Sequence, residues 1–567
     1  MRTTQSGFRE VAARYPDIPP LIILKLDIQR RGAVLTPPAL QKLRDVPAWM
    51  KCTMFYREGK PAVSHSVLLL RDGSSITAFS PARAPEGPYI IDAVDGRYQL
   101  LDGEDPVDEV EFCHTPAYCG KFTGRGTPLE HLIASRKQTL DICSFRHCMF
   151  RDTGDMCRFC SFFLDPETGR ENLPESGRIS DPEEIAEAVR EAAREPGCVS
   201  EIALTGGSDP SGSTLYENEF LRNFKILQAV GKVLGPGRFP SHLLGSAYSR
   251  TQLQRLRAET GVNNFCADLE VWDAELFARL CPGKAKWPGR DGWLRTLLDA
   301  VDIFGKGNVC SIIVAGVETA TGRFRSEDEA LESTLGGAEY LAKNGVAMLM
   351  RVWTPRAGTT LFTAQPASLD YLVRLARGIH LIKRSYGLQS VDHDYRHCGN
   401  HADTDLDRAK TGPKSFAQLN AAARSDPVTL PDAVNALALA PGTTCDLQTA
   451  DCDGKQSTSA MPFWRFLGGG LFALAESSCD SQTQRNLTFA LWAQAPVWLT
   501  LRNGKSCRIR ARVRKCVLTG PLYREFCLRA HDSRSPSAGV ESVWQLWVEN
   551  VEEAEISAAH REKHARR

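Results

Sequence analysis

The 567-residue chain has almost no excess of either charge, with 69 Lys and Arg residues against 68 Asp and Glu residues. This balance gives no global electrostatic attraction to nucleic acid or to an anionic membrane surface. Long apolar runs are missing too. The longest, near residues 466–475 and 487–501, are broken by glycine, proline or polar residues, and neither reaches the ~18–20 residues that a spanning helix needs. We therefore expect no membrane partner.

The chain also lacks the marks of a secreted protein. Residues 1–9 contain no apolar core and no small-residue cleavage site, so we expect no signal peptide. The 18 cysteines are many, but they are not spaced like the disulfide framework of a small secreted domain. These observations predict a cytoplasmic protein, whose reducing surroundings keep thiols available for a metal.

The length predicts two or three domains, and an apolar fraction of 42% allows a large core. Residues 1–125 are interpreted as an N-terminal mixed α/β extension. Within it, the pattern predicts a helix over residues 36–45 with Thr36 as its N-cap. It also predicts a strand over residues 65–74 that is closed by an Asp-Gly turn.

Residues 126–404 alternate short apolar runs with amphipathic stretches. The predicted strands are 138–143, 201–205, 242–245, 264–269, 309–316 and 347–352, and the predicted helices include 182–193, 217–233, 293–304 and 327–344. Continuous apolar strands that alternate with helices indicate a parallel sheet buried on both faces. Six such units predict an α/β fold with a partial (β/α)6 TIM-type barrel, which would hold a ligand at the C-terminal ends of its strands. An open doubly wound sheet is the alternative.

Residues 405–567 are interpreted as a polar linker followed by a small β-rich appended domain. Two β-type runs, 497–502 and 508–517, flank the Asn503-Gly504 dipeptide, which favours a tight hairpin turn. The last stretch, residues 549–567, has the charged pattern of a helix.

Four cysteines lie close together after the first predicted strand of the middle region. Cys157 and Cys160 form a C-x-x-C pair, Cys148 precedes them by nine positions, and Cys143 offers a fourth thiol. Paired thiolates on a tight turn suit both an iron–sulfur cluster and a structural zinc ion. A closed zinc site would use all four thiols. For a three-cysteine cluster, either Cys143 or Cys148 could be the third ligand, and we favour Cys148 because its loop to Cys157 is shorter.

Two further motifs follow in a fixed order. A predicted strand runs into Gly206, Gly207 and Ser208, and a later apolar strand ends near Gly316 and Glu318. This succession of a cysteine loop, a Gly-Gly motif and an apolar strand closed by a glutamate resembles the radical S-adenosylmethionine (SAM) superfamily. The C-x8-C-x2-C spacing departs from the C-x3-C-x2-C that is most frequent there.

The resemblance implies a [4Fe–4S] cluster bound by Cys148, Cys157 and Cys160, with the fourth iron left for the amino and carboxylate groups of SAM. The resemblance also implies three contacts with SAM. The Gly-Gly motif, Gly206, Gly207 and Ser208, would hold its amino group, and Glu270 would meet its ribose or amino acid part. The late strand that ends near Gly316 and Glu318 would lie against adenine. The alternatives are a plain strand-to-loop turn, a helix capped by Asp273, and ordinary core.

Two segments resemble the biotin-synthase-like branch of the superfamily. They are residues 354–361, with a P-x-x-G-T-x-L pattern, and residues 280–284, with a Pro-Gly-Lys pattern. We assign Lys284 no role from the sequence, since a helix-end turn explains the pattern as well.

The sequence therefore predicts an enzyme that cleaves SAM reductively and uses a 5′-deoxyadenosyl radical to abstract hydrogen. The substrate is expected to be a small molecule, and the electron donor a protein such as flavodoxin or ferredoxin. One alternative is an RNA-modifying enzyme that uses a basic strand face formed by Arg508, Arg510, Arg512 and Arg514; nucleic acid is not the favoured partner. Another is a non-catalytic protein stabilised by zinc. A second metal at His393, His397, Cys398 and His401 is less expected than a solvated loop.

Overall fold

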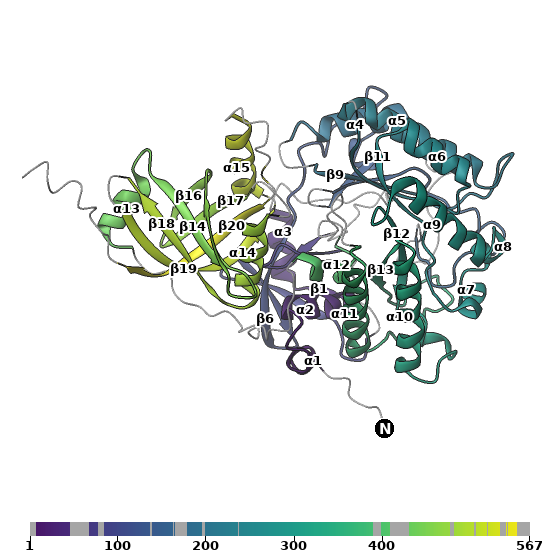
Figure 1. The fold of residues 1–567 in the computed structure, drawn as a ribbon, viewed down its shortest axis with the longest axis horizontal. Coiled ribbons are helices and arrows are strands. Elements are labelled where there is room, and N and C mark those ends of the chain that lie inside the picture. Colours follow the sequence, from purple (N-terminus) through teal and green to yellow (C-terminus); the bar gives the residue numbers. More distant parts are fainter. Residues whose placement is uncertain are drawn as a thin grey trace, which may run out of the picture.

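The computed structural model describes residues 7–45, 67–77, 84–136, 139–162, 164, 179–195, 199–235, 237–388, 399–408, 430–476, 481–503, 506–518, 520–532, 540 and 542–552. Within these residues the strands form three sheets, each drawn from a separate part of the chain. Figure 1 shows the sheet of the middle region (blue to teal) on one side, the C-terminal sheet (green to yellow) on the other, and the N-terminal sheet (purple) between them.

The strands of the middle sheet follow one another in chain order. Their spatial order is β13-β12-β11-β10-β9-β8-β7, and their bounds are β7 Ile133–Arg136, β8 Thr139–Cys143, β9 Glu201–Thr205, β10 Phe239–Leu244, β11 Val262–Cys266, β12 Val309–Ala315 and β13 Ala347–Val352. Strands β8 to β13 are parallel, and β7 is an antiparallel edge strand. The six predicted strands are confirmed as β8 to β13, whereas β7 was not predicted.

The strand order differs from that of an open doubly wound sheet. A doubly wound sheet reverses its strand order at a switch point, whereas each parallel strand here pairs with its neighbour in sequence. In the parts of the chain that the structure describes, no pairing joins β13 to the β7 end. The fold is therefore mixed α/β, and closure into a partial TIM-type barrel stays a prediction.

Helices follow the parallel strands β8 to β13 along the chain. They are α4 Pro182–Ala192, α5 Glu217–Leu234, α6 Arg250–Glu259, α9 Arg290–Phe304, α10 Glu327–Lys343 and α11 Leu369–Ser385, which confirms the four that were predicted. Two shorter helices, α7 Ala274–Leu280 and α8 Pro282–Lys286, follow β11. The carboxylate of Asp273 accepts from the Leu276 N–H at 2.9 Å. Asp273 is therefore the N-cap of α7, which confirms the predicted helix capped by Asp273.

The N-terminal sheet has the strand order β1-β4-β5-β6-β2-β3. The bounds are β1 Ala33–Leu35, β2 Leu68–Leu69, β3 Ser75–Ile76, β4 Tyr89–Val94, β5 Arg97–Asp102 and β6 Asp105–Phe112, with helices α1 Phe8–Arg14, α2 Pro20–Arg31 and α3 Pro37–Asp45. Helix α3 confirms the predicted helix, and Thr36 Oγ1 accepts from the Ala39 N–H at 3.3 Å. The predicted Asp-Gly turn is confirmed, but the strand before it is shorter in the described residues than the predicted range of 65–74. The Asp-Gly pair closes a β2–β3 hairpin, because Gly73 has a φ of +80° and Leu70 N–H bonds Ser74 O at 2.9 Å.

Helix α2 joins the N-terminal region to the middle sheet. All of its residues are buried, including Lys25, whose Nζ lies 2.6 Å from Asp405 Oδ2. Asp405 ends the short helix α12 (Ala402–Asp405), and Asp403 of the same helix lies 2.9 Å from Lys383 of α11. The N-terminal region and the middle sheet share one hydrophobic core. The predicted domain boundary at residues 404/405 falls inside α12.

The C-terminal sheet is antiparallel, with the order β15-β14-β18-β19-β20-β17-β16. Its bounds are β14 Thr444–Ala450, β15 Gln456–Ala460, β16 Trp464–Gly468, β17 Leu471–Glu476, β18 Pro496–Arg502, β19 Ser506–Val517 and β20 Ser542–Glu552, with helices α13 Asp432–Leu439, α14 Gln482–Trp492 and α15 Gly520–Asp532. The predicted β18–β19 hairpin is confirmed by its register. The helix predicted from residue 549 is wrong over 549–552, which pair with β19 in a strand; residues 553–567 lie outside the described part.

The C-terminal sheet has hydrophobic cores of its own, and it contacts the N-terminal sheet. The Cys516 N–H donates to Arg71 O at 2.8 Å, and the Trp492 indole N–H donates to Asp72 Oδ2 at 3.0 Å. These contacts lie at the β2–β3 turn, and Figure 1 shows the C-terminal sheet next to the N-terminal sheet. The C-terminal region is therefore a docked unit with its own core.

Candidate active site

The four-cysteine segment leaves β8 and is held against the residues that follow β9. The Ser144 N–H donates to Thr205 O at 2.8 Å, the Gly207 N–H donates to Phe145 O at 2.9 Å, and the Met149 N–H donates to Ser208 O at 2.9 Å. These bonds extend the parallel pairing beyond the last residues of the two strands. The Gly-Gly motif and the cysteine loop are therefore one structural unit, a relationship that the sequence did not reveal.

Gly207 is required for this close approach. An added Cβ at Gly207 would lie 1.8 Å from the carbonyl oxygen of His147 and 2.8 Å from the Cα of Cys148. At Gly206 it would lie 2.7 Å from Ser144 Oγ. A backbone oxygen at 1.8 Å cannot yield without movement of the whole loop. The two glycines thus pack the cysteine loop, and their contact with SAM stays a prediction.

Three of the four candidate thiols act on one another. Burial, followed by the nearby Cys160 and Cys157 thiols, raises the pKa of Cys148 to about 12. Burial followed by Cys157 raises the pKa of Cys160 to about 11. Neighbouring thiols raise each other's pKa because several thiolates in one place repel. Cys148, Cys157 and Cys160 therefore converge on one region, in which a cation would relieve the repulsion.

Cys143 lies apart from this group. Burial raises its pKa to about 11, and the other groups that act on it are Arg146, Phe145 and Asp141. Its Sγ donates to Phe145 O at 3.6 Å. The structure thus brings Cys148, and not Cys143, together with the C-x-x-C pair.

The four candidate thiols are not grouped as closely as the ligands of a mononuclear zinc site. Zn–S bonds of about 2.3 Å in a tetrahedron put the sulfurs ~3.8 Å apart. Among the described residues, one group of His, Cys, Asp and Glu has its ligand atoms within 4.8 Å of one another. That group does not include any of Cys143, Cys148, Cys157 and Cys160.

Glu270 faces the cysteine loop and forms a buried ion pair. Its carboxylate acts on both Cys157 and Cys160, and its Oε1 lies 2.7 Å from Lys284 Nζ. Glu270 has a φ of +68°, an uncommon backbone conformation for a non-glycine residue. Parallel bridging to Ile313 holds it there. Strained residues gather at binding and catalytic sites.

Lys284 is the residue that sequence reasoning left without a role. Its Nζ also donates to Asp268 O at 2.5 Å and lies 4.4 Å from the centre of the Trp293 ring. Burial opposes its charge, but Glu270 and then Cys157 raise its pKa above the usual range. The Pro-Gly-Lys pattern was the available signal. This segment places the fixed positive charge of Lys284 near Cys157.

Helices α7 and α8 also hold the far side of the cysteine loop. The Arg158 N–H donates to Leu280 O, and the Gly283 N–H donates to Asp155 O, both at 2.8 Å. The buried Cys281 is the group that most raises the pKa of Cys157, through a side-chain hydrogen bond. Cys281 is thus a further thiol at the site that spacing alone did not predict.

Glu318 and Gly316 have partners within the protein. Burial raises the pKa of Glu318 to about 6, and its two oxygens accept from the Gly316 N–H at 2.9 Å and from the Tyr371 hydroxyl. Gly316 has a φ of +94° and packs against Ala367. Both residues therefore fasten the end of β12 to α11. Their predicted contact with SAM stays a prediction.

Ser311 is a buried polar residue within β12. Its Oγ accepts from the Leu269 N–H at 2.9 Å, at the point where β11 has ended. A serine is therefore useful here, because it satisfies a backbone donor that the strand ladder leaves open.

Two arginines face the same region from the end of β13. Arg351 acts on Glu270. Burial, followed by repulsion from Arg351, lowers the pKa of Arg356 to about 10. Two guanidinium groups that repel each other, one of which also acts on Glu270, favour an anionic ligand.

The remaining candidates lie elsewhere. His393, His397 and Cys398 are outside the described residues, and His401 is buried with its Nδ1 3.0 Å from Met350 O. On β19 the arginine face is confirmed by alternating burial, but its charge is partly balanced. Arg510 and Arg512 pair with Glu549, and Arg514 pairs with Glu109 of the N-terminal sheet.

Across the described parts of the chain, no helix combines the length and apolar character needed to cross a bilayer.

Comparisons with known proteins give partial similarities. No family model matches the chain. It is 25% identical over 349 residues to the bacteriochlorophyllide c C-7(1)-hydroxylase of Chlorobaculum limnaeum, with 55% of this chain and 82% of that protein covered. A radical SAM methyltransferase structure from Sphaerobacter thermophilus covers 52% of this chain and 72% of its own, at 17% identity and a TM-score of 0.31. A Group A Streptococcus HupZ structure covers 22% of this chain and all of its own, at 12% identity and a TM-score of 0.18.

The match to the hydroxylase supports an enzyme, and in general it supports the radical SAM superfamily that the cysteine loop indicated. The biotin-synthase-like branch is not confirmed.

Proposed function

We propose that the chain is a radical SAM enzyme whose [4Fe–4S] cluster is bound by Cys148, Cys157 and Cys160. The observation that carries this proposal is the convergence of these three thiols: Cys157 and Cys160 raise the pKa of Cys148, and Cys157 raises the pKa of Cys160. The donor set suits a cluster, since thiolates are its usual ligands. The three thiols are not close enough together to bind one zinc ion without moving. They fit a larger iron–sulfur cluster better.

When bound, the reduced cluster and SAM supply a 5′-deoxyadenosyl radical that abstracts hydrogen from the substrate. The protein contributes binding, orientation and electrostatics. Lys284 and Glu270 place a fixed charge pair beside Cys157 and Cys160. Gly206, Gly207 and Ser208 hold the cysteine loop, and we propose that their backbone groups also receive the amino group of SAM.

We propose a tetrapyrrole-type substrate that carries carboxylates. The relative acts on bacteriochlorophyllide c by its name, and the match covers most of that protein. Arg351 and Arg356 supply two mutually repelling cations, and Arg351 also acts on Glu270. A carboxylate of the substrate or of SAM would relieve this repulsion. A hydrogen abstracted from an alkyl group of the ring would open the way to its oxidation. A protein such as flavodoxin or ferredoxin would supply the electron.

The first experiment is anaerobic reconstitution of the full chain with iron and sulfide. It should give about four irons per chain, and with dithionite and SAM the protein should release 5′-deoxyadenosine. Tight zinc with no iron uptake would remove the proposal.

The substrate proposal has a separate test. A carboxylate-bearing tetrapyrrole should increase the deoxyadenosine yield, whereas its methyl ester should not, and Arg351→Ala should reduce the difference. Equal yields with acid, ester and no tetrapyrrole would contradict the substrate class and leave the enzyme class standing.

A further inference from the structure

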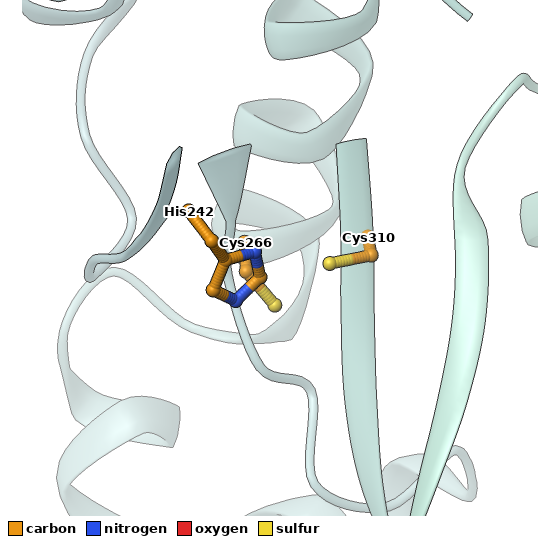
Figure 2. A group of neighbouring side chains, drawn as sticks. All are labelled: His242, Cys266 and Cys310. Carbon is orange, nitrogen blue, oxygen red and sulfur yellow. The ribbon is translucent and has the colours of Figure 1, made fainter. Parts of the chain in front are cut away.

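A second group of metal-binding side chains lies in the middle sheet, outside the cysteine loop. His242 of β10, Cys266 of β11 and Cys310 of β12 point toward one another from three neighbouring strands, as Figure 2 shows. Their ligand atoms all lie within 4.8 Å of one another, and all three residues are buried.

The parallel register explains why these residues meet. Cys266 is directly opposite Cys310, and His242 is opposite Asn264, two positions before Cys266. Residues two apart in a strand share a face. Asn264, Cys266, Cys310 and His242 therefore occupy one face of the sheet.

Asn264 supplies an independent sign of a ligand. Its side chain is 2% exposed, and its Oδ1 has no hydrogen-bond partner. A buried polar atom without a partner costs about 1–3 kcal/mol. Asn264 lies two residues before Cys266, on the same face of the sheet as the three side chains that could bind a metal.

We propose that His242, Cys266 and Cys310 bind one zinc ion, with a water molecule as fourth ligand that donates a hydrogen bond to Asn264 Oδ1. Two thiolates and a neutral imidazole are a donor set that zinc prefers, and ligand atoms this close need only small shifts to reach tetrahedral geometry. Binding releases the two thiol protons to solvent, so that the two thiolate charges balance the Zn²⁺ charge.

The zinc site is separate from the cluster site but is connected to it. Cys266 Sγ donates to Asp268 Oδ1 at 3.0 Å, and the Asp268 carbonyl accepts from Lys284. When Cys266 binds zinc as a thiolate, Asp268 Oδ1 keeps its bond from the Ile312 N–H at 3.0 Å. The zinc would thus stabilise the strand ends from which Glu270 and Lys284 are positioned.

The test uses the anaerobically purified, cluster-loaded full chain and measures zinc and iron together. The wild-type protein should hold about one zinc per chain in addition to its iron. Cys266→Ser and Cys310→Ser should each lose the zinc, and Asn264→Ala should weaken zinc affinity by roughly 10-fold. Cys445→Ser is the matched control, because Cys445 is equally buried but lies in the C-terminal sheet.

Two further measurements keep the result decisive. The Cys148→Ser/Cys157→Ser/Cys160→Ser variant should lose its iron and keep its zinc, which separates this site from the cluster. X-ray absorption at the zinc edge of the wild-type protein, which needs no variant, should show two sulfurs and at least one nitrogen. Wild-type protein that takes up no zinc, a Cys266–Cys310 disulfide, or a zinc bound by sulfur alone would each overturn the proposal.

Discussion

Lys284 Nζ lies 2.7 Å from Glu270 Oε1, and the two side chains are only 8% and 17% exposed. This pair is the link between the parallel sheet and the cysteine loop. Glu270 belongs to the segment after β11, Lys284 belongs to α8, and both act electrostatically on Cys157. A charge pair in this position sets the potential at the candidate ligand atoms.

Lys284→Met should be strongly destabilising. It leaves the Glu270 carboxylate buried without its cation, and removal of one partner of a buried pair costs about 3–5 kcal/mol. Burial already raises the pKa of Glu270, and loss of Lys284 raises it further. The penalty should therefore be largest at neutral pH and should shrink as the pH falls and Glu270 becomes protonated. Denaturant unfolding at several pH values measures it.

The matched control is the Lys284→Met/Glu270→Gln double variant. It removes both charges, so it should recover a large part of the lost stability. A double variant no more stable than Lys284→Met would show that the lysine acts by packing on Trp293 rather than by pairing.

Gly207→Ala should displace the cysteine loop and lower both iron content and thermal stability. The cause is the 1.8 Å approach of an added Cβ to His147 O. Gly336→Ala is the control: Gly336 lies in α10, and an added Cβ meets nothing within 4 Å. In a helix that change should stabilise by about 1 kcal/mol. Full iron content in Gly207→Ala would contradict the close packing of the two segments.

Cys148→Ala should abolish iron binding, whereas Cys143→Ala should retain it. The C-x-x-C thiols raise the pKa of Cys148, whereas other groups act on Cys143. Iron analysis after anaerobic reconstitution compares the two variants under one protocol. Retention of iron by Cys148→Ala together with its loss in Cys143→Ala would exchange the two assignments.

The middle strands were predictable because they are buried on both faces, so that each is a continuous apolar run between helices. Helix α2 was not predicted. All of its residues are buried, so no polar face gives it a helical period. The Asp-Gly turn between β2 and β3 was predicted, but β3 was not, because a two-residue strand is too short to show alternation.

The candidate site was predictable only where its residues are close in sequence. The C-x-x-C pair and the Gly-Gly motif are local patterns. The contacts of Cys281 with Cys157, and of Lys284 with Glu270, depend on how α7 and α8 fold back onto the loop. The group of His242, Cys266 and Cys310 has one residue on each of three successive strands, and no motif spacing marks it.

Glu318 should give the protein a measurable pH dependence. Burial raises the pKa of this carboxyl from its ordinary value of 4.5 to about 6, so the folded protein holds the proton more tightly than the unfolded chain. Stability from this group is therefore present below pH 4.5 and is lost as the pH rises through 6, by about 2 kcal/mol in all. Glu318→Gln keeps an acceptor for Tyr371 and should gain stability relative to wild type between pH 4.5 and 7. An unchanged difference across that range would contradict the shift.

A chain that ends at residue 408 should fold better than one that ends at residue 404. The longer chain keeps Asp405, the partner of Lys25 at 2.6 Å, and both of these side chains are fully buried. Loss of Asp405 leaves Lys25 as a buried charge, at a cost of about 3–5 kcal/mol. Thermal unfolding, iron content and deoxyadenosine yield should favour residues 1–408, and Lys25→Met should restore part of the stability of residues 1–404. If both truncated chains fail alike while the full chain folds, the contacts of Trp492 and Cys516 with the β2–β3 turn are essential to the fold.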